Sequence, residues 1–318
     1  MIDRRSLLLS VPGLATLGAS SAFAQAWPDK PIRFIVPVAP GSATDGVARQ
    51  VANALPKYIP GAQVVVDNRP GAGTVLGTDA VAKAPADGYT ILFNLSSFYT
   101  AQFMEKVNFD AVADFEPIAK MTYTTLVMVT APDSPYKTVA DLVAAAKKAP
   151  KTIAFANAGD GTTSHMGGAL LASLANIELV HAPYKNGSQA MIDVSSGQVG
   201  IGFSGPAALP LVKAGKLRII ATTGAKRTLE GIPDVRETKG LEQYEVGSPV
   251  WAFAPKGTPA AIVNRLSDAF GKIAATPEFK AFADAQQLAV DYQPAAAVKA
   301  ASPGESAKWK RLVALTKT

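Results

Sequence analysis

The stretch that decides the fold class is residues 32–45, IRFIVPVAPGSATD. Its first five residues form a short apolar run rich in β-branched side chains, which predicts a buried strand. A small-residue turn follows, and Val47, Val51 and Leu55 are then spaced for one face of a helix. The turn gathers backbone amides, hydroxyl groups and a helix N-terminus, a combination that suits an anion such as a carboxylate or phosphate.

A second apolar run, residues 64–66, ends in another small-residue turn at residues 68–73. Residues 32–77 therefore read as strand, turn, helix, strand and turn. This order predicts a parallel sheet, with ligands at the carboxyl ends of its strands.

Strand and helix signals alternate along the rest of the chain. Further strands are expected at residues 89–93, 126–129, 153–155, 199–203, 217–221 and 251–254. Helices are expected at residues 78–84, after Thr138, after His165, and at Thr258-Pro259 and Thr276-Pro277, where proline would occupy the first helical position. Such α/β alternation over about 290 residues predicts two Rossmann-like lobes, although periodicity does not place the crossovers between them.

Two corners of this pattern are alike, because Gly41–Asp45 and Gly161–His165 each place hydroxyl residues after a glycine at a helix start. If they face each other across a cleft, two helix N-termini point at one ligand, which would suit a carboxylate at each end. The alternative is that these residues are ordinary helix caps that bind nothing. Asp45 is interpreted first as a cap or loop-fixing residue and only second as a ligand contact, because its charge would repel an anion.

Catalytic and metal-binding motifs find little support. The chain has two histidines, His165 and His181, and no cysteine, which excludes thiol catalysis, disulfides and cysteine metal sites. Ser164 and His165 are sequence neighbours, a poor arrangement for a nucleophile and its base on a helix. His165 is interpreted as a cap or first-turn residue and His181 as structural. No clustered histidines or paired carboxylates stand out in the sequence, so we expect no metal and no cofactor.

The N-terminus predicts export. Arg4-Arg5 precede a short apolar run, and Ala22-Phe23-Ala24 is a small-x-small cleavage signal, so residues 1–24 are expected to be a signal peptide. The paired arginines fit a twin-arginine leader or a general secretory one, and an uncleaved anchor is the alternative. Cleavage of 24 of the 318 residues leaves 294 and lowers the net charge from +6 to +5. Because the positive charges are scattered rather than clustered, we expect no nucleic-acid partner.

Nine blocks of sequence, in order along the mature chain, resemble the periplasmic solute-binding proteins of tripartite tricarboxylate transporters, the Bug or TctC-like family. The blocks begin near residue 27 and include residues 36–45, 66–73, 82–90, 114–119, 183–185, 197–199, 213–218 and 254–259. The resemblance implies a type II periplasmic-binding-protein fold, with two Rossmann-like lobes around a ligand cleft. Residues 25–125 plus 249–318 would form lobe 1, and residues 126–248 would form lobe 2.

The resemblance also implies where a ligand would bind. One side of the cleft would be lined by the first corner and by the next strand end, namely Ala39, Gly41, Ser42, Thr44, Asp45, Ser96 and Ser97. The opposite side would be lined by Gly161, Thr162, Thr163, Ser164 and His165, with Tyr184 and Ser204 as further wall residues. Members of the family bind small carboxylates through main-chain amides, hydroxyls and ordered waters.

Three positions depart from the family pattern. Ser42 stands where the family has the second glycine of a pair. After Lys185 the family has glycine, whereas this chain has Asn186 and only then Gly187. Ser204 stands at a strand end where the family has aspartate. The loss of that acid disfavours a ligand bearing an ammonium group and favours a simple or aromatic carboxylate.

The function expected from sequence is therefore that of a periplasmic, non-catalytic protein that captures a di-/tricarboxylate or aromatic carboxylate. It would act as a monomer, close on its ligand and dock transiently on the subunits of a membrane transporter. The alternatives are a ligand-sensing component of a membrane two-component system and a hydrolase that uses Ser164 and His165.

Overall fold

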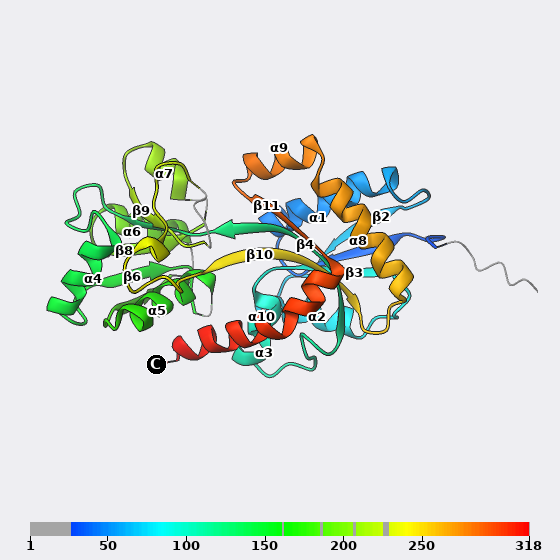
Figure 1. Cartoon of the computed structure of the whole chain (residues 1–318), viewed down its shortest axis with the longest axis horizontal. Coiled ribbons are helices and arrows are strands. Elements are labelled where there is room, and N and C mark those ends of the chain that lie inside the picture. Colours follow the sequence, from blue (N-terminus) through cyan, green and yellow to red (C-terminus); the bar gives the residue numbers. More distant parts are fainter. Residues whose placement is uncertain (1–26, 161, 185–186, 206–207, 225–228, 318) are drawn as a thin grey trace, which may run out of the picture.

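The computed structural model describes residues 27–160, 162–184, 187–205, 208–224 and 229–317. It contains a six-stranded and a five-stranded sheet, each flanked by helices and joined to the other by long strands (Figure 1). The predicted α/β alternation is thus confirmed. We refer to the two parts as the six-strand half and the five-strand half. In the described residues, no helix combines the length and apolar character needed to cross a membrane.

The sheet of the six-strand half has the strand order β11-β4-β10-β3-β1-β2. Its strands are β1 (Ile32–Val36), β2 (Val64–Asn68), β3 (Thr90–Asn94), β4 (Phe115–Thr125), β10 (Gly247–Pro255) and β11 (Ala289–Pro294). The predicted parallel pairing holds for β1 with β2 and β3. The sheet as a whole is mixed, because β10 runs antiparallel to β3 and β4, and β11 antiparallel to β4.

Helices cover both faces of this sheet. Alternation along β1 sends Phe34 into one apolar cluster with α1 and α8, and Ile35 into another with α3 and α10. The helices of this half are α1 (Ala43–Ala54), α2 (Val75–Ala82), α3 (Ser97–Met104), α8 (Ala260–Ala274), α9 (Pro277–Ala285) and α10 (Ala295–Leu315), with short 3-10 turns at Leu55–Lys57 and Ala72–Thr74.

The sheet of the five-strand half has the order β7-β6-β8-β5-β9, in which β6 is parallel to β7 and β8 while β5 is antiparallel to β8 and β9. Its strands are β5 (Val127–Thr130), β6 (Ala154–Asn157), β7 (Val180–Pro183), β8 (Ile201–Ser204) and β9 (Arg218–Thr222). Its helices are α4 (Val139–Lys148), α5 (Thr163–Ala175), α6 (Gly187–Ser195) and α7 (Leu209–Lys213), with a 3-10 turn at Val235–Glu237. Thr138 caps α4 in a capping box with Asp141, as the helix start predicted.

The two halves share strands and apolar packing. Only Leu126 separates β4 from β5, and β10 returns alongside β4 from the five-strand half (Figure 1). Helix α10 contacts α3, β4 and α5, so it touches both halves. Its residues Trp309 and Leu312 are buried in the same apolar cluster as Leu171 of α5. The core is therefore continuous from one half to the other.

Some elements were not expected from sequence. Helix α10 is 21 residues long with Pro303 inside it, and α3 begins at Ser97, where only a strand end was expected. Pro259 occupies the N-cap of α8 rather than its first helical position, whereas Thr276 and Pro277 occupy the cap and first turn of α9 as predicted. Tertiary burial supports α10 despite the proline, which removes one helical hydrogen bond.

Two glycines give a matched test of how tightly the five-strand half is packed. A Cβ at Gly168 of α5 would lie 2.2 Å from the Phe155 ring, whereas a Cβ at Gly304 of α10 would meet nothing within 4 Å. We expect Gly168→Ala to lower the free energy of unfolding by about 1–3 kcal/mol through overpacking. Gly304→Ala should raise it by about 0.5–1 kcal/mol, because alanine is favoured in a helix. Urea denaturation measures both, and equal effects of the two variants would contradict the packing described here.

Candidate functional site

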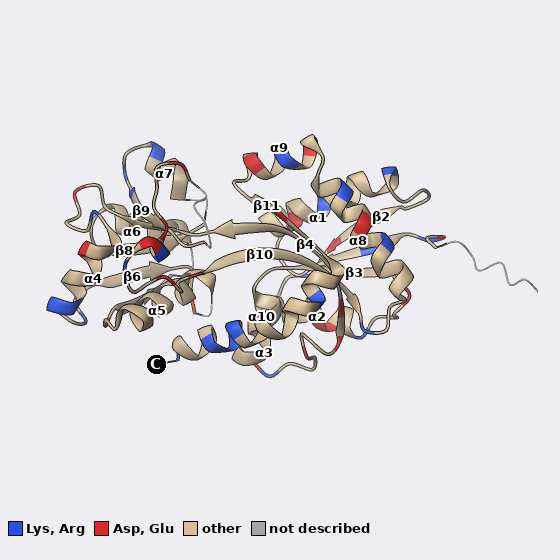
Figure 2. Cartoon of the chain, viewed as in Figure 1, with Lys and Arg blue, Asp and Glu red and all other residues tan. Residues whose placement is uncertain are grey.

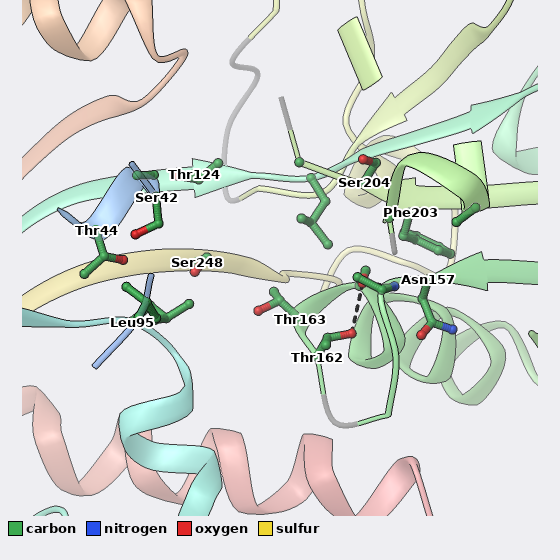
Figure 3. A pocket seen from close by; sticks show the side chains of 18 of the residues that line it. Ser42, Thr44, Leu95, Thr124, Asn157, Thr162, Thr163, Phe203, Ser204 and Ser248 are labelled. Carbon is green, nitrogen blue, oxygen red and sulfur yellow. Dashed lines mark hydrogen bonds between the residues drawn. The ribbon is translucent and has the colours of Figure 1, made fainter. Parts of the chain in front are cut away.

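A cavity of about 320 Å³ lies where the two halves meet (Figure 3). We call it the first cavity. Ser42 and Thr44 lie on its side formed by the six-strand half, while Asn157, Thr162, Thr163 and Ser204 lie on its side formed by the five-strand half. Its full described lining is Val38, Ser42, Ala43, Thr44, Leu95, Thr124, Leu126, Asn157, Ala158, Thr162, Thr163, Ser164, Gly187, Ala190, Met191, Phe203, Ser204, Gly205, Ser248 and Val250.

The first predicted corner forms the start of α1. Ser42 is the N-cap, and its hydroxyl accepts a hydrogen bond from the Asp45 amide at 3.3 Å. Gly41 has φ +82°, a left-handed conformation that glycine adopts without strain and that turns the chain from β1 into the helix. The first amides of a helix have no partner inside it, and in α1 they belong to Ala43 and Thr44, which line the cavity.

The second predicted corner forms the start of α5 in the same way. Thr162 is the N-cap, and its hydroxyl accepts from the His165 amide at 3.3 Å. Its hydroxyl also lies 3.0 Å from that of Ser164, which in turn accepts from the Ala158 amide. Thr163 and Ser164 occupy the first two helical positions and line the cavity. Gly161, the first residue of this corner, lies outside the described residues. The N-termini of α1 and α5, which belong to opposite halves, therefore face one cavity.

Asn157, at the end of β6, adds a hydrogen-bond donor. Its side chain is fully buried, and its Oδ1 accepts from the Gly159 amide at 2.9 Å. Its Nδ2 is buried without a hydrogen-bond partner in the described structure. The described lining of the first cavity contains hydroxyls and this amide but no charged side chain.

Asp45 serves its own half rather than the first cavity. Its side chain is only 3% exposed and accepts hydrogen bonds from Arg49, the Gly41 amide and Asn68. Burial alone would raise the pKa of Asp45, but these hydrogen bonds outweigh it and lower the pKa. Asp45 does not line the first cavity. The structure thus gives it the loop-fixing role that was the first interpretation from sequence.

A second cavity of about 300 Å³ adjoins the first and shares Val38, Leu95, Thr162 and Thr163 with it. Ser96 and Ser97, predicted as ligand contacts, line this second cavity and not the first. The Ser96 hydroxyl lies 2.9 Å from the Thr163 hydroxyl, which makes a hydrogen bond between the two halves. The halves therefore touch at the line where the two cavities meet.

The remaining predicted residues lie outside both described linings. Ala39 and Gly41 are exposed in the loop before α1. Tyr184 donates its phenol proton to Asp193 at 2.7 Å, and this bond together with burial raises its pKa to about 12. Both partners of this hydrogen bond belong to the five-strand half, so Tyr184 contributes to the packing of that half.

The two histidines form a pair that the sequence did not reveal. The rings of His165 and His181 stack at 3.7 Å with an angle of 6° between their planes, and Asp160 lies 3.9 and 3.7 Å from their Nδ1 atoms. This stacking corrects the expectation that no histidines cluster. The two histidines are 16 residues apart in sequence, and they meet because β7 returns beside β6 and α5. The Ser164 hydroxyl hydrogen-bonds the Thr162 hydroxyl and accepts a hydrogen bond from the Ala158 amide.

This histidine pair also bears on metal binding. Among the described residues, Asp160, His165 and His181 are the group whose spacing could hold an ion. However, lone pairs of the two rings lie in nearly parallel planes and cannot converge on one ion unless a ring turns. We therefore interpret the group as a stacked pair beside a carboxylate.

Several cavity residues were missed from sequence. Thr124 and Ser248 lie opposite each other on β4 and β10, and Asn157 ends β6. The first two are single polar residues in extended segments, with no turn to mark them. Asn157 could have been found by the rule that named the corners, because it is the last residue of a strand in a βα unit.

The histidine pair predicts a loss of stability in mild acid. Burial, and next the neighbouring His181, lower the pKa of His165 to about 4, against 6.5 in the unfolded chain. Below pH 6.5 the unfolded chain binds a proton that the folded chain refuses, so stability falls as pH drops from 6.5 toward 4. From pH 7 to 5 this should cost about 2 kcal/mol. Urea denaturation at several pH values should show that the free energy of unfolding falls less steeply with decreasing pH in His165→Gln than in the wild type. Identical slopes would contradict the lowered pKa of His165.

The Asp45 cluster predicts a large difference between two aspartates. Asp45→Ala leaves the Gly41 amide, Arg49 and Asn68 without their shared acceptor, and should lower the free energy of unfolding by about 1–3 kcal/mol. The control is Asp67→Ala, whose partner Arg69 is 43% exposed and whose removal should change stability little. Thermal denaturation compares them, and a tolerant Asp45 would contradict a loop-fixing role.

Comparison with known proteins identifies the class to which this architecture belongs. A family model described as "Tripartite tricarboxylate transporter family receptor" matches residues 47–317. A UPF0065 protein of Pseudomonas sp. is 36% identical over 282 residues, covering 87% of this chain and 84% of the relative. Protein BugT of Bordetella pertussis is 35% identical over 270 residues, covering 82% of each.

Solved structures agree. A TctC solute-binding protein from Polaromonas superposes with a TM-score of 0.79 at 27% identity, covering 90% of this chain and 99% of that one. The periplasmic binding protein BugD superposes with a TM-score of 0.72 at 31% identity, covering 92% and 99%. These relatives are solute-binding proteins rather than enzymes. The matched family, the relatives and the fold agree: the chain belongs to the receptor family of tripartite tricarboxylate transporters, the Bug or TctC-like solute-binding proteins.

Proposed function

We propose that this protein captures a small organic acid in the first cavity and delivers it to a tripartite tricarboxylate-type membrane transporter. The observation that carries the proposal is the convergence of two helix N-termini, one from each half, on a cavity lined by hydroxyl groups from both halves. Helix N-termini stabilise anions through free amides and the helix dipole. Because no charged side chain lines the described cavity, these dipoles would take the place of a counter-charge.

The bound carboxylate would contact hydroxyls and amides from both halves. Its proposed partners are Ser42, Thr44, Asn157, Thr162, Thr163, Ser164 and Ser204, together with Thr124 and Ser248 on the connecting strands β4 and β10 (Figure 3). Contact with both halves would favour a closed arrangement over an open one, since the ligand gains affinity only where both walls meet it.

The size of the cavity and a relative support a small carboxylate. About 320 Å³ suits a compact ligand. An R. palustris protein, 26% identical with a TM-score of 0.76, was solved with adipate and covers 92% of this chain and 98% of its own. We accordingly infer a di-/tricarboxylate or an aromatic carboxylate.

The proposed biological setting follows from the N-terminus and the family. Residues 1–24 would be a cleaved signal peptide that directs the protein to the periplasm; they lie outside the described residues. Lobe 1 would comprise residues 25–125 plus 249–318, and lobe 2 residues 126–248. The placement of β4, β5 and β10 supports these boundaries. The ligand-bound monomer would dock transiently on the transporter subunits.

A thermal-shift screen tests the function. Mature protein should be stabilised by one class among mono-, di- and tricarboxylates, aromatic acids and amino acids. A ligand at 100 times its dissociation constant adds about 2.7 kcal/mol, which is readily seen. The bound acid should be recovered unchanged. Absence of any shift, after unfolding and refolding to remove a co-purified ligand, would contradict the proposal.

A matched pair of variants tests the site. Asn157→Asp keeps the acceptor for Gly159 but replaces the free amide with a negative charge, so carboxylate affinity should fall about tenfold or more. Asn264→Asp makes the same chemical change at an exposed position of α8 and should leave the dissociation constant unchanged. Calorimetric titration of both variants, with circular dichroism to verify folding, gives the comparison. Equal affinities would place the ligand elsewhere.

A further inference from the structure

The second cavity is built beside the first but differs from it in charge. Its shared wall includes Leu95 and Thr163, and it extends past Val75 and Met104 between α2, α3 and the loop before α5. Its volume of about 300 Å³ nearly equals that of the first cavity. A ligand longer than the first cavity therefore has a second space directly adjacent to it.

One contact between the two halves lies where the first and second cavities meet. The Ser96 and Thr163 hydroxyls are 2.9 Å apart, and Thr163 lines both cavities. A hydrogen bond between two hydroxyls contributes only about 1 kcal/mol net, so a ligand can displace it and offer each hydroxyl another partner. This contact lies between the two cavities, so a short ligand can stay in the first cavity while a long ligand can displace the contact and reach the second.

Charge distinguishes the two spaces. The first cavity has no charged residue in its described lining, whereas the second has Glu105 and Asp160 and no basic residue in its own. Both acids are exposed. A second carboxylate placed there would be repelled, while an uncharged or cationic end would not. Figure 2 shows the wider surroundings, in which acidic and basic residues are scattered over both halves.

We propose that the second cavity is a subsite for the distal end of a long-chain carboxylate, and that Glu105 and Asp160 select a neutral or cationic end over a second carboxylate. The carboxylate head stays in the first cavity, and the chain passes between Ser96 and Thr163. An ammonium group beside the carboxylate finds no acid in the described first cavity, whereas an ammonium at the far end meets two. This inference rests on the proposed function, because it assumes that the first cavity holds the carboxylate.

The test compares end groups at constant chain length. Calorimetric titration measures octanoate, 8-aminooctanoate and octanedioate, with butyrate and succinate as short probes confined to the first cavity. Wild type should bind octanoate and 8-aminooctanoate more tightly than octanedioate. In Glu105→Gln and Asp160→Asn, octanedioate should gain about three- to tenfold relative to 8-aminooctanoate, because a like charge is removed.

The control is Asp268→Asn, which removes an exposed carboxylate of α8 that lines neither cavity. Asp268→Asn should leave the affinity of octanedioate relative to 8-aminooctanoate unchanged. All three variants should bind butyrate and succinate as tightly as the wild type does. The inference is overturned if no eight-carbon probe binds, or if the ratio is the same in Glu105→Gln, Asp160→Asn and Asp268→Asn. Failure of every probe, short ones included, would instead count against the proposed function.

Discussion

The antiparallel pairing of β4 with β10 is the constraint on which the rest of the structure depends. The pairing extends from Phe115 with Pro255 to Thr125 with Gly247, and it carries the chain out of one half and back again. Gly247 fits because a Cβ there would lie 2.3 Å from the Tyr123 ring and hydroxyl. The same register sets Thr124 opposite Ser248 in the lining of the first cavity. The strand pair that joins the halves therefore also supplies the base of the site.

Helix α10 adds a second connection of a different kind. Its apolar residues are buried with residues of both halves, so the hydrophobic cluster does not stop at the boundary between the two sheets. Burial of large side chains such as Trp309 contributes several kcal/mol. Any opening of the cleft must either keep this packing, with motion about an axis close to α10, or lose part of it. We expect the former, because packed cores resist continuous deformation.

Much of the fold could be predicted from sequence, because strands such as β1 and helices such as α8 carry strong local periodicity. The two corners could be predicted for the same reason: glycine and hydroxyl residues at a helix start have a local chemical purpose. What could not be predicted depends on distant partners. The stacking of His165 on His181 requires β7 to return beside β6, and α10 persists through Pro303 only because its face is buried. Ser96 and Ser97 were predicted to share one wall with the first corner, but they line the second cavity and not the first, and periodicity cannot decide such a distinction.

The described lining of the first cavity offers the proposed carboxylate ligand oriented dipoles and no basic side chain. Mobile ions screen exposed charge pairs over a Debye length of about 8 Å at physiological ionic strength, but they have little access to amides and hydroxyls inside an enclosed space. Binding of this kind releases few counter-ions, so the affinity should vary little between dilute and saline surroundings. Carboxylate capture of the proposed kind would in this way be insulated from changes in the ionic strength of the medium.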